Sequence, residues 1–185
     1  MAENLMGKKV AMLIAFRDFR DAEYFIPKEI LESAGADVIA VSTRKGLVIG
    51  ADGGEVRTDV SIGEINPENF DAIVFVGGPG ALDYLDNQTS YDLAKETVKK
   101  GRILAAICIS SVILANAGVL KGKKATVWAS PLDRNPIRIL KNGGAIYEDN
   151  PVVIDGKIVT ANGPEAAEEF GKALVSLLTA APLRV

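Results

Sequence analysis

The chain has 185 residues, a net charge of -3 and a hydrophobic share of 48%, which is typical of a globular domain. Its basic residues are scattered, which argues against a nucleic-acid partner, and no apolar run approaches the roughly 20 residues that cross a bilayer. The N-terminus lacks the apolar core of a signal peptide, so we expect one cytoplasmic domain over residues 1–185, with no membrane partner.

Strand and helix signals alternate along the chain. Continuous apolar runs predict strands that are buried on both faces at residues 10–15, 38–42, 72–76 and 103–107. Glycines that end the intervening helices follow at Gly35, Gly101 and Gly118. This alternation predicts a parallel sheet that is covered by helices on both faces.

Two β-hairpins are expected beside this pattern. Residues 47–60 carry the sequence GADGGE between short apolar stretches and predict a hairpin next to the main sheet. Asp155 and Gly156 separate two further apolar runs and favour a hairpin with a type I′ turn. A final helix is predicted over residues 165–178.

Cys108, the only cysteine, directly follows the predicted strand at 103–107 and precedes a helical segment that Gly118 ends. A cysteine at a helix N-terminus lies near the positive end of the helix dipole, so we expect its pKa below the usual value of about 8.5. The alternative is a buried cysteine that acts as a small hydrophobic residue. The strand-turn-helix position favours a nucleophile.

Histidine is absent from the entire sequence. This absence excludes Ser-His-Asp and Cys-His catalysis, and it excludes imidazole proton shuttles even if an identical subunit donated residues. With one cysteine and no histidine, zinc sites of the usual kinds are also excluded, and we expect no metal.

A glycine-rich segment, Gly77 to Gly80 in FVGGPGALDYL, follows the predicted strand at 72–76. One of its N–H groups, together with that of Ile109, could form an oxyanion hole, although such a strand exit is more often only a tight turn. The spacing for nucleotide phosphates is missing, so we expect neither NAD nor ATP and no cofactor.

Acidic candidates follow the first strand in RDFRDAEYF, namely Asp18, Asp21 and Glu23. Asp21 is expected as the N-cap of the next helix. Glu23 lies in the first turn, where its carboxyl could reach the thiol with a raised pKa, donating a hydrogen bond to a thiolate or acting as general base. The alternative is a glutamate that only complements the helix dipole.

Taken together, Glu23 in AEYFIP, the loop GGPGALDYL and the segment AICISS resemble the ThiJ/PfpI superfamily of intracellular proteases, glyoxalases and deglycases, related to class I glutamine amidotransferases. The resemblance extends over nearly the whole chain. It implies a flavodoxin-like α/β/α sandwich with a mostly parallel central sheet and small β-hairpin additions, and it implies a homo-oligomer. It also implies that Cys108 is the nucleophile, Glu23 the active-site carboxylate, and Gly78 with Ile109 the backbone oxyanion site.

The sequence departs from the protease-like members, in which a histidine follows the cysteine, because Ile109 occupies that position here. Other members supply a histidine after the elbow helix, where this chain has ATVWAS with Trp128. General acid–base help is typically worth roughly 10²- to 10⁴-fold, so peptide hydrolysis is not expected.

Three functions remain open from the sequence. The first is cysteine-dependent chemistry on small carbonyl electrophiles such as 2-oxoaldehydes or their protein adducts, which requires no amine leaving group. The second is a redox or stress sensor in which an oxidant converts Cys108 to a sulfinic acid. The third is a structural homo-oligomer with an inactive site, for which Tyr24 and Phe25 are surface candidates, although core packing is preferred for both.

Overall fold

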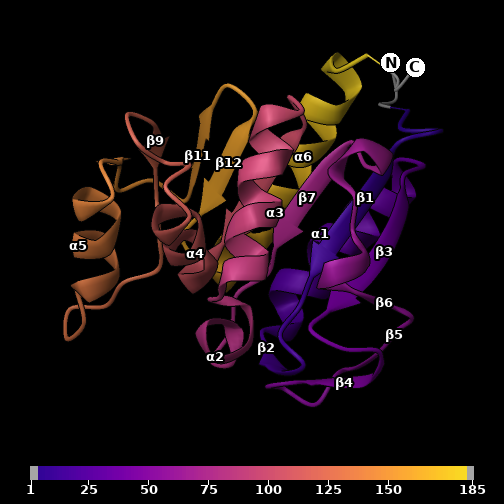
Figure 1. The fold of residues 1–185 in the computed structure, drawn as a ribbon, viewed down its shortest axis with the longest axis horizontal. Coiled ribbons are helices and arrows are strands. Elements are labelled where there is room, and N and C mark those ends of the chain that lie inside the picture. Colours follow the sequence, from indigo (N-terminus) through magenta and orange to yellow (C-terminus); the bar gives the residue numbers. More distant parts are fainter. Residues whose placement is uncertain (1–3, 183–185) are drawn as a thin grey trace.

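The computed structural model describes residues 4–182 and consists of a seven-stranded sheet between two helical layers (Figure 1). The strand order in this sheet is β11-β12-β8-β7-β1-β3-β6, and only the pairing of β11 with β12 is antiparallel. The sheet strands are β1 (Lys9–Leu13), β3 (Asp37–Ser42), β6 (Val60–Ser61), β7 (Ala72–Phe75), β8 (Ile103–Ile107), β11 (Val152–Asp155) and β12 (Ile158–Ala161). The predicted flavodoxin-like α/β sandwich is confirmed.

The α-helices cover both faces of this sheet, with α3 and α4 in front and α6 behind in Figure 1. They are α1 (Asp21–Ser33), α2 (Ala81–Leu85), α3 (Gln88–Lys99), α4 (Ser111–Asn116), α5 (Asn135–Asn142) and α6 (Ala167–Ala180). Short 3-10 helices span Ile62–Glu64, Pro67–Asn69, Cys108–Ser110 and Pro164–Ala166. Within residues 4–182, no helix has the length and apolar character needed to cross a membrane.

Alternate residues of the central strands supply two separate cores. In β1, Val10 and Met12 pack with α1 and α6, whereas Ala11 and Leu13 face α3 and α4. Successive strand side chains point to opposite faces, so strands covered on both sides are apolar throughout. This explains why the continuous apolar runs in the sequence predicted the strands correctly.

Both predicted hairpins are present. Strands β4 (Gly46–Gly50) and β5 (Glu55–Thr58) pair antiparallel and join β2 (Arg17–Phe19) in a separate three-stranded sheet. A further two-stranded sheet combines β9 (Lys124–Ala125) with β10 (Ile146–Tyr147).

The predicted type I′ turn after β11 is wrong. Asp155 pairs with Ile158, so Gly156 and Lys157 form the turn, and only Gly156 has a positive φ, at 61°. A single positive φ at the first central position is the pattern of a type II′ turn. Asp155 therefore ends the strand instead of turning it, and its carboxylate accepts a hydrogen bond from the Lys124 N–H at 2.9 Å.

Candidate functional site

Cys108 lies at a sharp turn between β8 and α4, as the sequence predicted. Its φ is 63°, a left-handed conformation that is uncommon for a residue other than glycine. The next turn is fixed to the neighbouring strand because Ser110 Oγ donates a hydrogen bond to the Val76 carbonyl at 2.7 Å. The Cys108 side chain is therefore held at the carboxyl edge of the sheet, where open α/β folds bind ligands.

Glu23 reaches the same place from the first turn of α1. It is fully buried, and its main-chain N–H donates to the Arg20 carbonyl at 3.1 Å. Among the described residues, neither carboxyl oxygen has a hydrogen bond of standard geometry. The Cys108 thiol and the Gly77 N–H are nevertheless close enough to lower the Glu23 pKa. The carboxyl therefore lies beside the sulfur, with the Gly77 N–H as its other polar neighbour.

The glycine-rich loop holds Glu23 and Cys108 together. A Cβ atom at Gly77 would collide with the Glu23 carboxyl and with the Cys108 side chain. Gly78 has a φ of 122°, and a Cβ atom there would overlap the main chain of Asp18, Phe19 and Arg20. Only glycine lets this loop pass so close to the segment before α1. This close approach explains the run of glycines that the sequence alone could not distinguish from an ordinary tight turn.

The pKa values of Glu23 and Cys108 are both raised above their ordinary values. Burial raises the pKa of Glu23 to about 7, opposed by the Cys108 thiol and the Arg20 charge. Burial also raises the pKa of the Cys108 thiol, and the neighbouring Glu23 carboxylate adds to this effect, while the N–H groups of Ile109 and Gly78 oppose it. The expected lowering of the cysteine pKa is thus wrong in direction, because burial and a neighbouring carboxylate outweigh the helix N-terminus.

A cavity of about 410 Å³ opens over this pair. Its lining includes the five site residues that the resemblance implied, namely Glu23, Gly78, Cys108, Ile109 and Trp128. The other lining residues are Arg20, Pro79, Leu82, Asp83 and Pro164. Trp128 is 36% exposed, and its main-chain N–H donates to the Cys108 carbonyl at 3.3 Å. The cavity is therefore formed by residues from five separate parts of the chain.

The chain is similar to known proteins over most of its length. The model of the DJ-1/PfpI family matches residues 8–177. The chain belongs to the DJ-1/PfpI family. The superfamily predicted from the Cys108 and Glu23 motifs is confirmed.

Several known proteins are similar to this chain over most of their length. An uncharacterized protein of Methanocaldococcus jannaschii is 47% identical over 170 residues, which cover 91% of this chain and 82% of that protein. The deglycase PfpI of Pyrococcus furiosus is 31% identical, covering 90% of this chain and 98% of the other. A ThiJ/PfpI domain protein from Brachyspira murdochii has a solved structure with a TM-score of 0.90, 33% identity, and coverage of 96% and 99%.

The other two acidic candidates do not enter this DJ-1/PfpI cavity. Asp18 is exposed, and its main-chain carbonyl accepts a hydrogen bond from the Gly80 N–H at 3.0 Å. Asp21 is the first residue of α1 and not its N-cap, a position that Arg20 occupies without a side-chain cap. The Asp21 carboxylate instead accepts hydrogen bonds from the N–H groups of Asp52 and Gly54, at 2.9 and 2.6 Å. Sequence spacing alone cannot separate these roles, because the partner loop lies 31 residues away.

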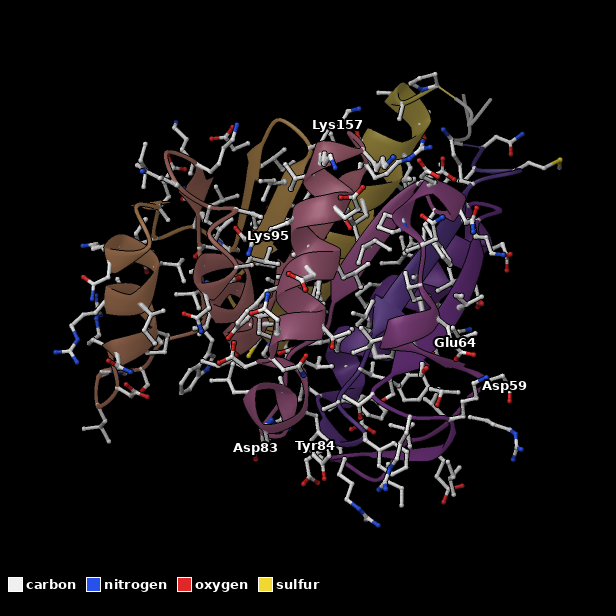
Figure 2. The ribbon with its side chains drawn as sticks, viewed as in Figure 1. Asp59, Glu64, Asp83, Tyr84, Lys95 and Lys157 are labelled. Carbon is white, nitrogen blue, oxygen red and sulfur yellow. The ribbon has the colours of Figure 1, made fainter. Side chains whose placement is uncertain are left out.

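The sequence missed five lining residues, Arg20, Pro79, Leu82, Asp83 and Pro164. Asp83 lies on α2, at the end of the molecule opposite Lys157 on the β11–β12 turn (Figure 2). All five lie within or next to motifs that the sequence did mark. Arg20 directly follows β2, and the other four lie in segments that follow β7 and β12, where parallel strands bring their carboxyl ends to one edge of the sheet.

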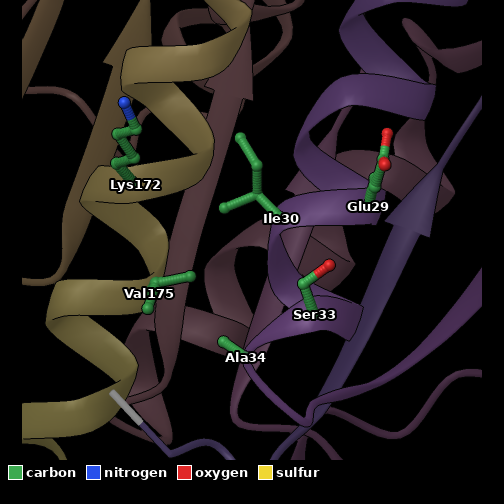
Figure 3. A pocket seen from close by; sticks show the side chains of 6 residues that line it. All are labelled: Glu29, Ile30, Ser33, Ala34, Lys172 and Val175. Atoms are coloured by element: carbon green, nitrogen blue, oxygen red, sulfur yellow. The ribbon is translucent and has the colours of Figure 1, made fainter. Parts of the chain in front are cut away.

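A second cavity of about 420 Å³ lies between α1 and α6 (Figure 3). It is lined by Glu29, Ile30, Ser33, Ala34, Lys172 and Val175. Glu29, the lining residue of α1 that is nearest to Glu23 in the sequence, is about 9 Å farther along the helix, and this groove shares no lining residue with the cavity over Cys108. Among residues 4–182, no group of three or more His, Cys, Asp or Glu side chains is arranged to hold a metal ion.

Proposed function

We propose that the chain, acting as one ThiJ/PfpI-like domain over residues 1–185, is a cysteine-dependent enzyme that acts on small carbonyl electrophiles. Cys108 would be the nucleophile and Glu23 its proton acceptor. The observation that carries the proposal is the buried Glu23 carboxyl, with a pKa of about 7, beside the only thiol in an open cavity. A general base works best when its pKa is near the working pH. Relatives from two Pyrococcus species, 31% and 30% identical, are named deglycases, which supports this class of chemistry.

In this proposal, the sulfur attacks the aldehyde carbon of a 2-oxoaldehyde while the thiol proton passes to Glu23. The new oxyanion lies beside the N–H groups of Gly78 and Ile109 and takes the thiol proton from Glu23 to give a hemithioacetal, which leaves Glu23 ionised. Glu23 then removes the proton from the former aldehyde carbon and delivers it to the neighbouring carbon, while the hydroxyl proton moves to the neighbouring oxygen, which leaves a thioester. Water hydrolyses the thioester, so methylglyoxal and water give lactate and the free thiol, without a cofactor.

Proteolysis is not part of this proposal. Peptide hydrolysis needs a proton for a poor amine leaving group, and the sequence contains no histidine to deliver it. Addition to an aldehyde has no such leaving group. The single carboxyl of Glu23 is therefore sufficient for the carbonyl reaction.

The test is lactate formation from methylglyoxal by the wild-type protein and by variants of the pair. We expect Cys108→Ala to abolish turnover and Glu23→Gln to lower kcat/KM by about 10²-fold or more. The wild-type rate should rise with pH through about 7 as Glu23 ionises. Glu169→Gln, which changes an exposed carboxylate on α6, is the matched control and should keep full activity.

Turnover that survives in Cys108→Ala would contradict the proposal. Absence of any wild-type turnover, with mild peroxide converting Cys108 to a stable sulfinic acid in mass spectra, would favour the redox sensor instead. The N–H groups of Ile109 and Gly78 beside the sulfur support that second function. Both functions would operate in the cytoplasm.

We also infer a homo-oligomer. Exposed apolar side chains on α1 support it, since Phe25 is 40% and Ile26 37% exposed. Tyr24, the other surface candidate from the sequence, is buried in the core as expected, whereas the expected core packing of Phe25 is wrong because its ring is partly exposed on α1.

A further inference from the structure

Arg20 carries the only positive charge among the described residues that line the Cys108 cavity. It immediately precedes α1, and its main-chain N–H donates to the Gly77 carbonyl at 2.9 Å. The backbone of Arg20 is therefore fixed against the same glycine-rich loop that holds the sulfur. The side chain is 33% exposed, so its guanidinium is reachable from solvent.

Among the residues that the structure describes, only one nitrogen of the Arg20 guanidinium has a hydrogen-bond partner. Its Nη1 contacts both carboxylate oxygens of Asp52, at 3.1 and 3.2 Å. Within residues 4–182, Nε and Nη2 make no hydrogen bond. These two nitrogens form one edge of the guanidinium, which matches the two oxygens of a carboxylate. Asp52 therefore anchors one side of the group and leaves the other side available.

The negative charges around Arg20 leave room for an anion. Glu23, with a pKa of about 7, is uncharged in a large fraction of molecules at neutral pH. Asp83 is the other acidic residue of the lining, and it is exposed, so solvent screens its charge. Asp52 is 55% exposed and is not part of the lining.

We propose that Arg20 determines specificity at this site by binding the carboxylate of small 2-oxo carboxylates, so that their carbonyl carbon meets the Cys108 sulfur. The attack of Cys108 on the bound carbonyl rests on the proposed function, whereas the binding of the carboxylate by Arg20 does not. Addition forms one carbon–sulfur bond, converts the carbonyl to a hydroxyl and moves the thiol proton to the new oxygen by way of Glu23. Electrons and atoms balance without a further reactant.

Because the chain has a single cysteine, two alkylating reagents of nearly equal size can test the charge preference directly. Iodoacetate carries a carboxylate, whereas iodoacetamide is neutral. Both react with the same sulfur, so the ratio of their rates cancels any change in the nucleophilicity of Cys108. We expect this ratio to fall about fivefold in Arg20→Gln, to fall less in Arg20→Lys, and to stay unchanged in Arg17→Gln, an exposed arginine outside the lining.

A second measurement uses glyoxylate to protect Cys108 from iodoacetamide. Protection should occur in the wild-type protein and in Arg17→Gln and be lost in Arg20→Gln. A ratio that changes by less than twofold in both Arg20 variants, or equally in Arg17→Gln, would overturn the inference. Neither measurement requires turnover. Failure to convert methylglyoxal would contradict the proposed function, but it would not affect the test of anion binding by Arg20.

Discussion

Glu23 links the chemistry of the site to the stability of the fold. A carboxyl with no exposed surface is costly to ionise, which is why its pKa rises from 4.5 to about 7. At neutral pH the residue is divided between a neutral form that can donate a hydrogen bond and an ionised form that can accept a proton. Both forms are useful beside a thiol whose own pKa is raised.

This raised pKa predicts a pH-dependent stability. Between pH 4.5 and about 7, the unfolded chain releases the Glu23 proton while the folded chain retains it. The free energy of unfolding should therefore fall as pH rises through this window, by about 3 kcal/mol in all. Urea unfolding at several pH values, followed by fluorescence of Trp128, the only tryptophan, measures this slope. Glu23→Gln should remove most of it and Glu169→Gln should not, and an unchanged slope in Glu23→Gln would refute the assignment.

At the scale of elements, the start of α1 organises a hairpin that is distant in sequence. The carboxylate of Asp21 accepts hydrogen bonds from two N–H groups in the turn between β4 and β5. A Cβ atom at Gly50 or Gly54 would collide with this carboxylate, so the turn closes tightly around it. The same turn carries Asp52, which holds Arg20 at the cavity. Helix and hairpin thus position the cavity lining jointly.

Replacing Asp21 with alanine should loosen this turn. Two charged hydrogen bonds are lost, which should lower the free energy of unfolding by about 2 kcal/mol. Amide hydrogen exchange at Asp52 and Gly54 should become faster, while exchange in β8 keeps its protection relative to global unfolding. Asp59→Ala is the control, because its carboxylate is exposed and forms only a surface ion pair with Arg57 at 3.6 Å. Equal exchange in the two variants would contradict the anchoring role.

At the scale of the whole molecule, the beginning of β1 is tied to the end of α6. Lys8 is only 4% exposed, and its Nζ donates hydrogen bonds to the carbonyls of Ala181 and Pro182, at 2.7 and 2.9 Å. A cation suits this position because the carbonyls at a helix C-terminus carry partial negative charge. These hydrogen bonds join two segments that are far apart in the sequence, since Lys8 and Ala181 are separated by 173 residues.

Lys8→Met should lower the free energy of unfolding by about 2 kcal/mol, because the carbonyls of Ala181 and Pro182, directly after α6, lose a charged donor. Lys9→Met is the neighbouring control and should cost less than about 1 kcal/mol, since its amine is 3.9 Å from Asp37 and 38% exposed. Urea midpoints for the two variants measure the difference. Equal midpoints would show that the tie contributes nothing to stability.

The sequence by itself determined the sheet, the Cys108 turn and the family. Strand β8 was predicted at its exact bounds because a strand buried on both faces must be apolar at every position, a purely local signal. The position of Glu23 in the first helical turn allowed its carboxyl to reach the thiol but left the helix-dipole role open, and the family resemblance favoured the thiol. Neither the role of Asp21 nor the lining residue Arg20 could be predicted, because both depend on a hairpin turn that reaches them from far along the chain.

Only the tertiary structure decided the charge state of the site. The helix N-terminus is visible in the sequence and predicts a lowered cysteine pKa, but desolvation depends on what the rest of the chain packs around the sulfur. Glu23 lies 85 residues before Cys108 in the sequence. Its carboxylate and the burial of the sulfur together outweigh the effect of the local helix dipole on the Cys108 pKa. Local pattern therefore located the nucleophile, whereas long-range packing set its protonation.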